Sequence, residues 1–160
     1  SQPRGNTELE RISDIISVPA VDGMRVCAVA FQGRLACYGA EQGNLLWSRD
    51  LSSDRGAILH ENIYLTDSKG VVYALDKNTG ATLWMNDQLT LRHTTAPQVL
   101  GKFVLVGDLE GYLHVLDSTD GSLKARFSTD DSPILTPPAV FDSGILLQTQ
   151  KGRLYSIAIY

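Results

Sequence analysis

The sequence predicts an all-β protein, a β-propeller fragment of about three and a half four-stranded antiparallel blades, and three observations support this. A glycine that leads a strand-like run recurs at intervals of 37, 41 and 41 residues, at Gly33, Gly70, Gly111 and Gly152. A second glycine follows each of the first three after ten residues, at Gly43, Gly80 and Gly121. Trp47 and Trp84 each stand four residues further on. A unit of about 40 residues that repeats in this way is typical of propeller blades, whereas a sandwich or a single barrel does not require it.

Within each unit the apolar residues alternate over short runs, which indicates strands. In the second unit the expected strands are 57–59, 63–66, 71–75 and 82–85, and in the third they are 97–100, 103–106, 112–116 and 123–127. The expected organisation is a connector over 1–16 from a preceding blade, then a partial propeller over 17–160 with blades at approximately 17–52, 56–90, 95–130 and 136–160.

The repeated glycines and tryptophans have a structural and a functional interpretation. The glycines fit hairpin turns that need a positive φ, and no helix follows them to bind a phosphate. The tryptophan rings could stack on a ligand, but their periodic position favours packing between neighbouring blades. The third unit has Ala125 where a tryptophan would stand, so we expect its outer strand to be the least well held.

Composition and motifs exclude several classes of function. The 160 residues hold 14 Lys and Arg against 18 Asp and Glu, a net charge of −4, so no basic face for nucleic acid is expected. No apolar run approaches the roughly 20 residues of a membrane-spanning helix, and the polar N-terminus is not a signal peptide. We find no catalytic motif. His60, His93 and His114 lack a paired metal spacing, so no catalytic residue, metal or cofactor is expected.

Cys27 and Cys37 fall on neighbouring strands of the first unit. With a three-residue loop at 31–33 the two thiols face each other, and a disulfide is then expected in an oxidising compartment. With a two-residue loop the pair is offset by one residue. The alternative is two small buried apolar side chains.

The last unit ends after its third strand, which predicts that this is the C-terminal part of a larger ring. An open arc of blades exposes strand edges that favour pairing with another chain. We therefore expect either self-association through these edges or only moderate stability.

The repeat resembles the pyrroloquinoline-quinone-type propeller family, most clearly in 71–76 together with 79–84, where Val-Tyr-Ala-Leu-Asp precedes Thr-Gly-x-x-Leu-Trp. WD40 repeats do not match, because Trp-Asp and Gly-His pairs do not occur. Within the broad family the whole chain resembles the C-terminal half of the propeller lipoproteins of the outer-membrane β-barrel assembly (Bam) machinery. The stretches that carry this resemblance are 6–14, 106–114 and 152–157.

This resemblance implies an eight-bladed, non-catalytic scaffold in the periplasm, held at the outer membrane by a lipid on the N-terminus of the full-length protein. It implies binding to the POTRA domains of BamA and help in folding and inserting outer-membrane proteins, whose unfolded forms it could also bind. The stretch 11–19 matches a family loop that contacts BamA, in which Asp14 fits one acidic position and Ile16 stands where a second acid is expected. Arg11 and Asp14 are the candidate contacts with BamA. The alternatives are a fragment of a quinoprotein dehydrogenase, which would need an adjacent Cys-Cys pair that is missing here, or a propeller module with another partner.

Overall fold

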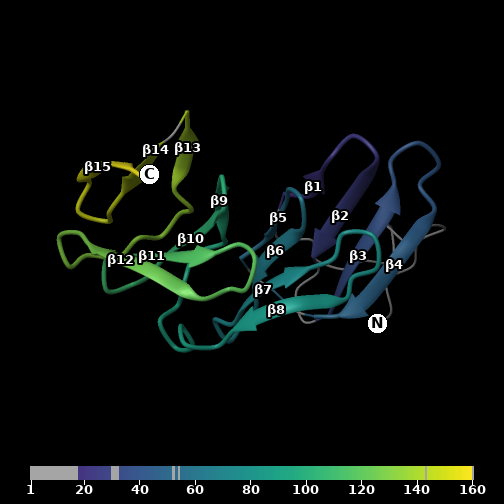
Figure 1. The fold of residues 1–160 in the computed structure, drawn as a ribbon, viewed down its shortest axis with the longest axis horizontal. Coiled ribbons are helices and arrows are strands. Elements are labelled where there is room, and N and C mark those ends of the chain that lie inside the picture. The colour runs from purple at the N-terminus through teal and green to yellow at the C-terminus, as the bar shows by residue number, and fades with distance from the viewer. Residues whose placement is uncertain (1–17, 30–32, 52, 54, 143, 160) are drawn as a thin grey trace, which may run out of the picture.

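Four antiparallel sheets follow one another along an arc in the computed structural model of the chain (Figure 1). The structure describes residues 18–29, 33–51, 53, 55–142 and 144–159. Helices are absent from these residues, and three of the sheets have four strands while the last has three. The predicted all-β class and the blade architecture are therefore confirmed.

Each sheet is a simple meander in which the strands pair in chain order, and we call the sheets blades 1 to 4. Blade 1 holds β1 (Ala20–Val21), β2 (Arg25–Val29), β3 (Arg34–Gly39) and β4 (Leu45–Asp50). Blade 2 holds β5 (Ala57–Leu59), β6 (Ile63–Thr66), β7 (Val72–Leu75) and β8 (Thr82–Asn86).

Blade 3 repeats the pattern with β9 (Gln98–Leu100), β10 (Phe103–Gly107), β11 (Tyr112–Asp117) and β12 (Leu123–Ser128). Blade 4 holds β13 (Ala139–Phe141), β14 (Gly144–Gln148) and β15 (Leu154–Ala158). The first strand of each blade lies on the concave side of the arc, and the outer strands β4, β8 and β12 form its rim (Figure 1).

The blades repeat in detail as well as in strand order. A register shift between the third and fourth strands falls at Cys37/Tyr38, Ala74/Leu75 and Val115/Leu116, the same place in blades 1 to 3. The tryptophans stand at this position, since Cys37 pairs with Trp47 and Ala74 with Trp84, and Ala125 takes it in blade 3.

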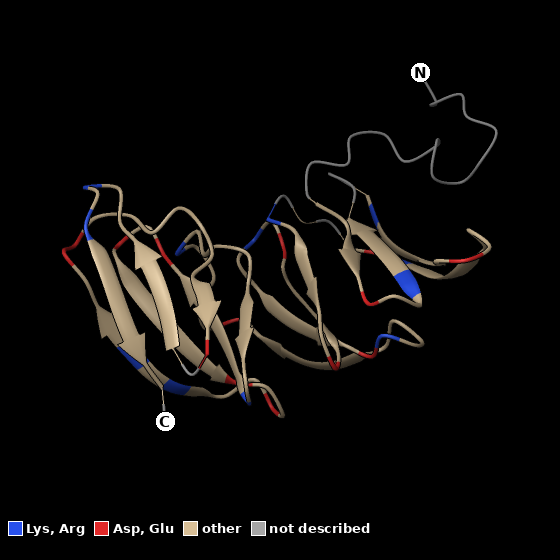
Figure 2. Cartoon of the chain, turned by 90° about the horizontal axis from the view of Figure 1, so that it is seen from above, with Lys and Arg blue, Asp and Glu red and all other residues tan. Residues whose placement is uncertain are grey.

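The core is divided among the three junctions between blades. Cys27, Val29 and Leu35 of blade 1 meet Ile63 and Leu65 of blade 2, and comparable apolar groups fill the other two junctions. Each fully buried leucine or isoleucine contributes about 1.5–3 kcal/mol, so the junctions hold the arc together. Charged residues lie mainly in the loops and at strand ends (Figure 2).

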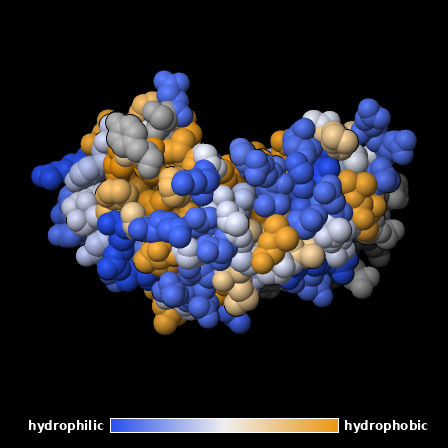
Figure 3. Space-filling model, viewed as in Figure 1, coloured by the Kyte–Doolittle hydropathy of each residue, from blue (hydrophilic) through white to orange (hydrophobic). Residues whose placement is uncertain are grey.

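The outward face of blade 4 remains apolar and exposed. Phe141, Leu146 and Leu154 are 48%, 39% and 64% exposed. The register places all three on the same face of the sheet, the face that points away from blade 3. Apolar atoms are visible over this blade in Figure 3.

Candidate functional site

The two tryptophans connect blade 1 to blade 2 and blade 2 to blade 3 at the rim. The Trp47 Nε1–H donates to the carbonyl of Lys77 at 3.0 Å, and that of Trp84 donates to the carbonyl of Ser118 at 2.8 Å. Each ring lies flat against a glycine of the same turn, because a Cβ on Gly80 or Gly121 would stand 2.5 or 2.3 Å from the ring carbons. Both glycines have a positive φ, 75° and 74°. The repeat residues thus form a ring on one blade and a seat for it on the next.

A second donor accompanies each ring, which the sequence analysis did not identify. Two residues after the tryptophan, Arg49 donates to the carbonyl of Gly80 at 2.8 Å and Asn86 donates to the carbonyl of Gly121 at 2.8 Å. Blade 3 has Ala125 and Phe127 at the two places, so it offers neither the ring nor the polar donor. In blades 1 and 2 the polar donor stands two residues after the tryptophan, and this shared spacing was the signal available in the sequence.

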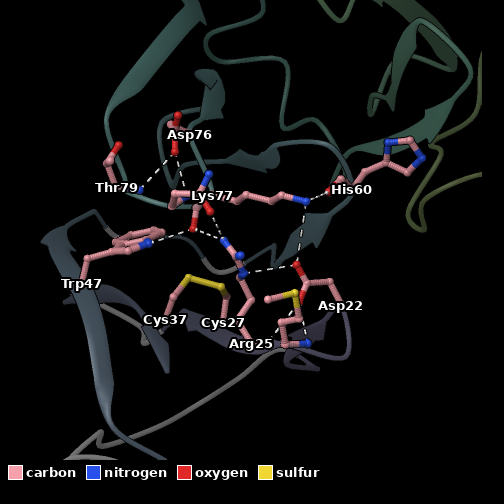
Figure 4. Close-up of polar contacts among 11 residues, drawn as sticks. Asp22, Arg25, Cys27, Cys37, Trp47, His60, Asp76, Lys77 and Thr79 are labelled. Carbon is pink, nitrogen blue, oxygen red and sulfur yellow. Dashed lines mark hydrogen bonds and ion pairs between the residues drawn. A yellow bond between two sulfur atoms is a disulfide. The ribbon is translucent and has the colours of Figure 1, made fainter. Parts of the chain in front are cut away.

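Charged groups surround the first of these seats (Figure 4). Arg25 donates to the carbonyl of Lys77 at 2.7 Å and to the Asn78 side chain at 2.8 Å, and it is paired with Asp22 at 3.2 Å. Burial would raise the pKa of Asp22, but hydrogen bonds from the Met24 and Arg25 amides, together with nearby Arg25 and Lys77, lower it. The turn that receives Trp47 is therefore fixed to blade 1 by both apolar and ionic contacts.

A disulfide joins Cys27 of β2 to Cys37 of β3 immediately behind Trp47 (Figure 4). The two residues are direct partners in the register, with Cα atoms 4.1 Å apart, and both are buried. This is the arrangement that the three-residue loop predicts.

The hairpins between the second and third strands carry the other repeated glycines. Gly70, Gly111 and Gly152 have φ values of 93°, 83° and 85°. In blades 2 and 3 an aspartate starts the turn, and its Oδ1 accepts two backbone N–H groups: Asp67 from Lys69 and Val71, Asp108 from Glu110 and Tyr112. Gly33 directly precedes β3, and Gly43 has a φ of 65° in the turn before β4.

These hairpins and the loops between blades, at 87–97 and 129–138, come together on one face, which we call the loop face. Backbone hydrogen bonds join them in series, from the Leu91 N–H to Lys69, from Leu109 to Arg92 and from Ile134 to Asp108. Leu91, Leu109 and Leu135 on this face are 83%, 40% and 58% exposed. A continuous set of loops thus presents apolar side chains to the outside.

A buried polar cluster beneath the loop face centres on Asp108. Its Oδ2 accepts hydrogen bonds from Arg92 Nε at 2.7 Å and lies 2.8 Å from His114 Nε2, while Arg92 also pairs with Glu110 at 2.9 Å. Burial alone would raise the pKa of Asp108, but hydrogen bonds from His114, the Tyr112 amide and Arg92 lower it to about 2. The cluster ties the inter-blade loop to the hairpin of blade 3. Sequence reasoning missed it because its members are 16 and 6 residues apart on different elements.

Arg11 and Asp14, the candidate contacts with BamA, lie outside the residues that the structure describes. Within those residues no group of three or more His, Cys, Asp or Glu side chains is placed to hold a metal ion. No helix in the described part of the chain is long and apolar enough to span a membrane.

The chain is similar to known proteins along nearly its whole length. The family model described as outer membrane protein assembly factor BamB matches residues 1–86 and 68–159. Curated proteins of that name from Bordetella pertussis and Escherichia coli are 39% and 37% identical over 97% and 98% of this chain. The chain spans only about two fifths of their length, 41% and 40%.

Solved structures agree with this similarity. BamB from Moraxella catarrhalis superposes with a TM-score of 0.84 and 26% identity over 97% of this chain and 46% of that chain. The quinohemoprotein alcohol dehydrogenase of Comamonas testosteroni shares the fold alone, with a TM-score of 0.57 and 22% identity. A repeat unit with its ring and seat, four consecutive blades and the match of the family model together place this chain in the family of outer membrane protein assembly factor BamB.

Proposed function

We propose that this protein acts as a non-catalytic scaffold of the Bam complex, binding the POTRA domains of BamA and assisting the folding and insertion of outer-membrane proteins. The observation that carries the proposal is the loop face, where Leu91, Leu109 and Leu135 are exposed on loops that hydrogen bonds hold in place. Exposed apolar side chains that are held in place and surrounded by polar residues are typical of protein–protein contact sites.

The proposed place of action is the periplasm, with attachment to the outer membrane through an N-terminal lipid on the longer protein. The Cys27–Cys37 disulfide supports this, because disulfides persist in oxidising compartments such as the bacterial periplasm. Quinoprotein dehydrogenase activity has less support, since its solved representatives are 22–24% identical to this chain and share the fold.

Binding to purified POTRA domains of BamA, measured by calorimetry with the 160-residue chain, tests the proposal. We expect Leu135→Asp to weaken binding at least tenfold, because it places a charge in the apolar part of the loop face. We expect Asp14→Arg to weaken binding about fivefold if that carboxylate contacts BamA, as the family resemblance implies.

Leu83→Asp is the matched control, because Leu83 is 51% exposed on the rim strand β8, away from the loop face. It should leave the affinity unchanged. Absence of binding by the unmodified chain, or equal weakening by Leu135→Asp and Leu83→Asp, would count against the loop face as the BamA site.

A further inference from the structure

A pocket of about 320 Å³ opens between blades 2 and 3, where the loop 87–97 crosses the hairpin that joins β6 to β7. Arg55, Asp67, Lys69, Leu91, His93 and Thr94 contribute to its lining. The pocket lies beside the Asp108 cluster but shares no lining residue with it.

The loop that roofs the pocket is held in an unusual backbone conformation. Leu91 and His93 both have a positive φ, 67° and 51°, which side chains other than glycine rarely adopt. Arg55 fixes the loop by donating to the carbonyls of His93 and Thr94 at 3.4 and 2.8 Å, and the Leu91 N–H reaches the carbonyl of Lys69 at 3.4 Å. Strained backbone that its surroundings hold in place is concentrated at ligand sites.

Thr94 supplies a polar atom without a partner. The residue is 1% exposed, and its hydroxyl is buried and makes no hydrogen bond with any described part of the chain. Buried hydroxyl groups nearly always have a hydrogen-bond partner. A buried hydroxyl without one in the wall of a pocket therefore indicates that a bound ligand supplies the partner.

The charge of the pocket favours an anion. Arg55 and Lys69 are cationic, whereas Asp67, the single acidic group among the described lining residues, accepts the Lys69 and Val71 amides at its Oδ1 at 2.8 and 2.9 Å. The ammonium of Lys69 is exposed, and no carboxylate of the described residues lies within ion-pair distance of it. A carboxylate can accept hydrogen bonds from an ammonium and from a hydroxyl at once.

The exposed Leu91 at the mouth of the pocket points to a peptide as the source of that carboxylate. Its side chain is 83% exposed and can pack on the apolar neighbours of an acidic residue. We propose that this pocket binds the side-chain carboxylate of an acidic, extended peptide segment of a partner protein, with Lys69 and Thr94 as donors to the carboxylate. The inference goes beyond the proposed function and does not depend on binding to BamA.

Titration of the isotope-labelled 160-residue chain with a peptide, followed by amide chemical shifts, tests the proposal. The probes are acetyl-Ala-Leu-Glu-Leu-Ala-amide, the same peptide with Gln in place of Glu, and sodium acetate. We expect saturable shifts at Lys69 and at 90–94 with the Glu peptide, and at least tenfold weaker binding of the Gln peptide. Acetate should bind at least tenfold more weakly than the Glu peptide.

Three variants separate the pocket from general charge effects. Lys69→Glu should abolish binding, and Thr94→Val, which keeps the shape of the side chain, should weaken it about threefold without lowering Tm. Lys151→Glu is the matched control, because Lys151 holds the same hairpin position in blade 4 and is also exposed; it should change the affinity less than twofold.

Several results would overturn the proposal. Equal binding of the Glu and Gln peptides would exclude recognition of the carboxylate. Equal losses in Lys69→Glu and Lys151→Glu would assign the binding to net charge. Acetate binding as tightly as the Glu peptide would mean that the pocket takes a small free anion and not a peptide.

Discussion

Asp108 is the residue on which the local order of the loop face depends most. Its side chain is fully buried and accepts hydrogen bonds from two backbone amides and from Arg92, with His114 on the same oxygen. These contacts join the loop 87–97, the hairpin between β10 and β11, and the strand β11. They therefore hold that hairpin in a fixed position on blade 3. A buried charge of this kind is stable only while its partners remain in place.

Replacing Asp108 with Asn should lower the free energy of unfolding by about 1–3 kcal/mol, because a neutral amide then replaces the buried carboxylate that accepts from Arg92 and lies beside His114. Urea denaturation at pH 7 measures this. Glu110→Gln is the milder control, since Glu110 is exposed and its pair with Arg92 should contribute about 1 kcal/mol or less. A loss below 1 kcal/mol in Asp108→Asn would contradict the importance of the cluster.

The same carboxylate predicts a pH dependence. Its pKa is about 2 in the folded protein against an ordinary value of 3.8, so the folded state binds the proton less tightly than the unfolded state. Its contribution, about 2 kcal/mol, is therefore complete above about pH 4 and is lost as the pH falls toward 2. Denaturation midpoints between pH 5 and pH 2 should fall more steeply for the unmodified protein than for Asp108→Asn. Parallel curves would contradict this.

The turn glycines offer a second test at the scale of single residues. Gly121→Ala adds a methyl group where the ring of Trp84 lies and also forces a positive φ on alanine. Gly43→Ala imposes the same backbone strain, about 1–2 kcal/mol, with nothing within 4 Å of the new atom. We expect Gly121→Ala to destabilise the protein by at least about 2 kcal/mol more than Gly43→Ala, as measured by urea denaturation. Equal effects would mean that the ring moves aside freely.

At the scale of elements, the outer strands β4 and β8 each make contacts with two blades. β8 pairs with β7 inside blade 2, while Trp84 and Asn86 bond to the turn of blade 3. β12 has no such side chains, and Ala125 packs only among the apolar residues of the third junction. The rim strands of blades 1 and 2 are therefore fixed on both sides, and that of blade 3 on one.

Truncating the ring should show this difference. We expect Trp84→Ala to cost about 3–5 kcal/mol, because the ring is buried and its N–H is satisfied. Trp47→Ala should cost less, since that ring is only half-buried. Hydrogen exchange of the β8 and β4 amides would locate the damage at the rim, and uniform protection across all the strands would contradict the role assigned to the rings.

The disulfide holds β2 and β3 together in blade 1. Closing so short a loop should stabilise the folded state by about 2–3 kcal/mol. We expect a reducing agent to lower Tm, and the oxidised, denatured protein to show no free thiol. Two free thiols in protein purified without a reductant would contradict the bridge.

The local sequence predicts the strands and hairpins that repeat from blade to blade, but it does not predict the contacts between blades. The glycine and tryptophan spacing predicts the hairpins, and the strands expected at 57–59 and 63–66 agree with β5 and β6. The seat of Trp84 on Gly121, by contrast, joins residues 37 positions apart, and the pocket under the loop depends on the positive φ of Leu91 and His93. Neither residue type favours that conformation, so only tertiary contacts impose it.

At the scale of the whole molecule, the arc ends in blade 4 with a strand that pairs on one side in the described part of the chain. β15 bonds to β14, and Leu154, the first residue of β15, is 64% exposed. Unpaired strand edges next to apolar faces promote association between chains. The relatives are more than twice as long as this chain.

We therefore expect the 160-residue chain to self-associate as its concentration rises, with sedimentation velocity as the measurement. Leu154→Lys should shift the equilibrium toward the monomer, because it places a charge on the open face, and should change the stability of the monomer by less than about 0.5 kcal/mol. Leu83→Lys on the rim is the control. Association that is unaffected by Leu154→Lys would place the contact elsewhere.

The division of each rim contact between two units limits how such a protein can grow or shrink during evolution. A duplication or deletion of a unit that holds both a ring and a seat, as blade 2 does with Trp84 and Gly80, leaves as many seats as rings. A deletion or duplication whose break point lies between Trp84 and Gly121 separates the ring from its seat. The indole of Trp84 is then exposed to water, and the surface of Gly121 is left uncovered. We therefore expect blades to be gained or lost as complete units, with the break points of the duplication or deletion outside the segment between a tryptophan and the glycine that receives it.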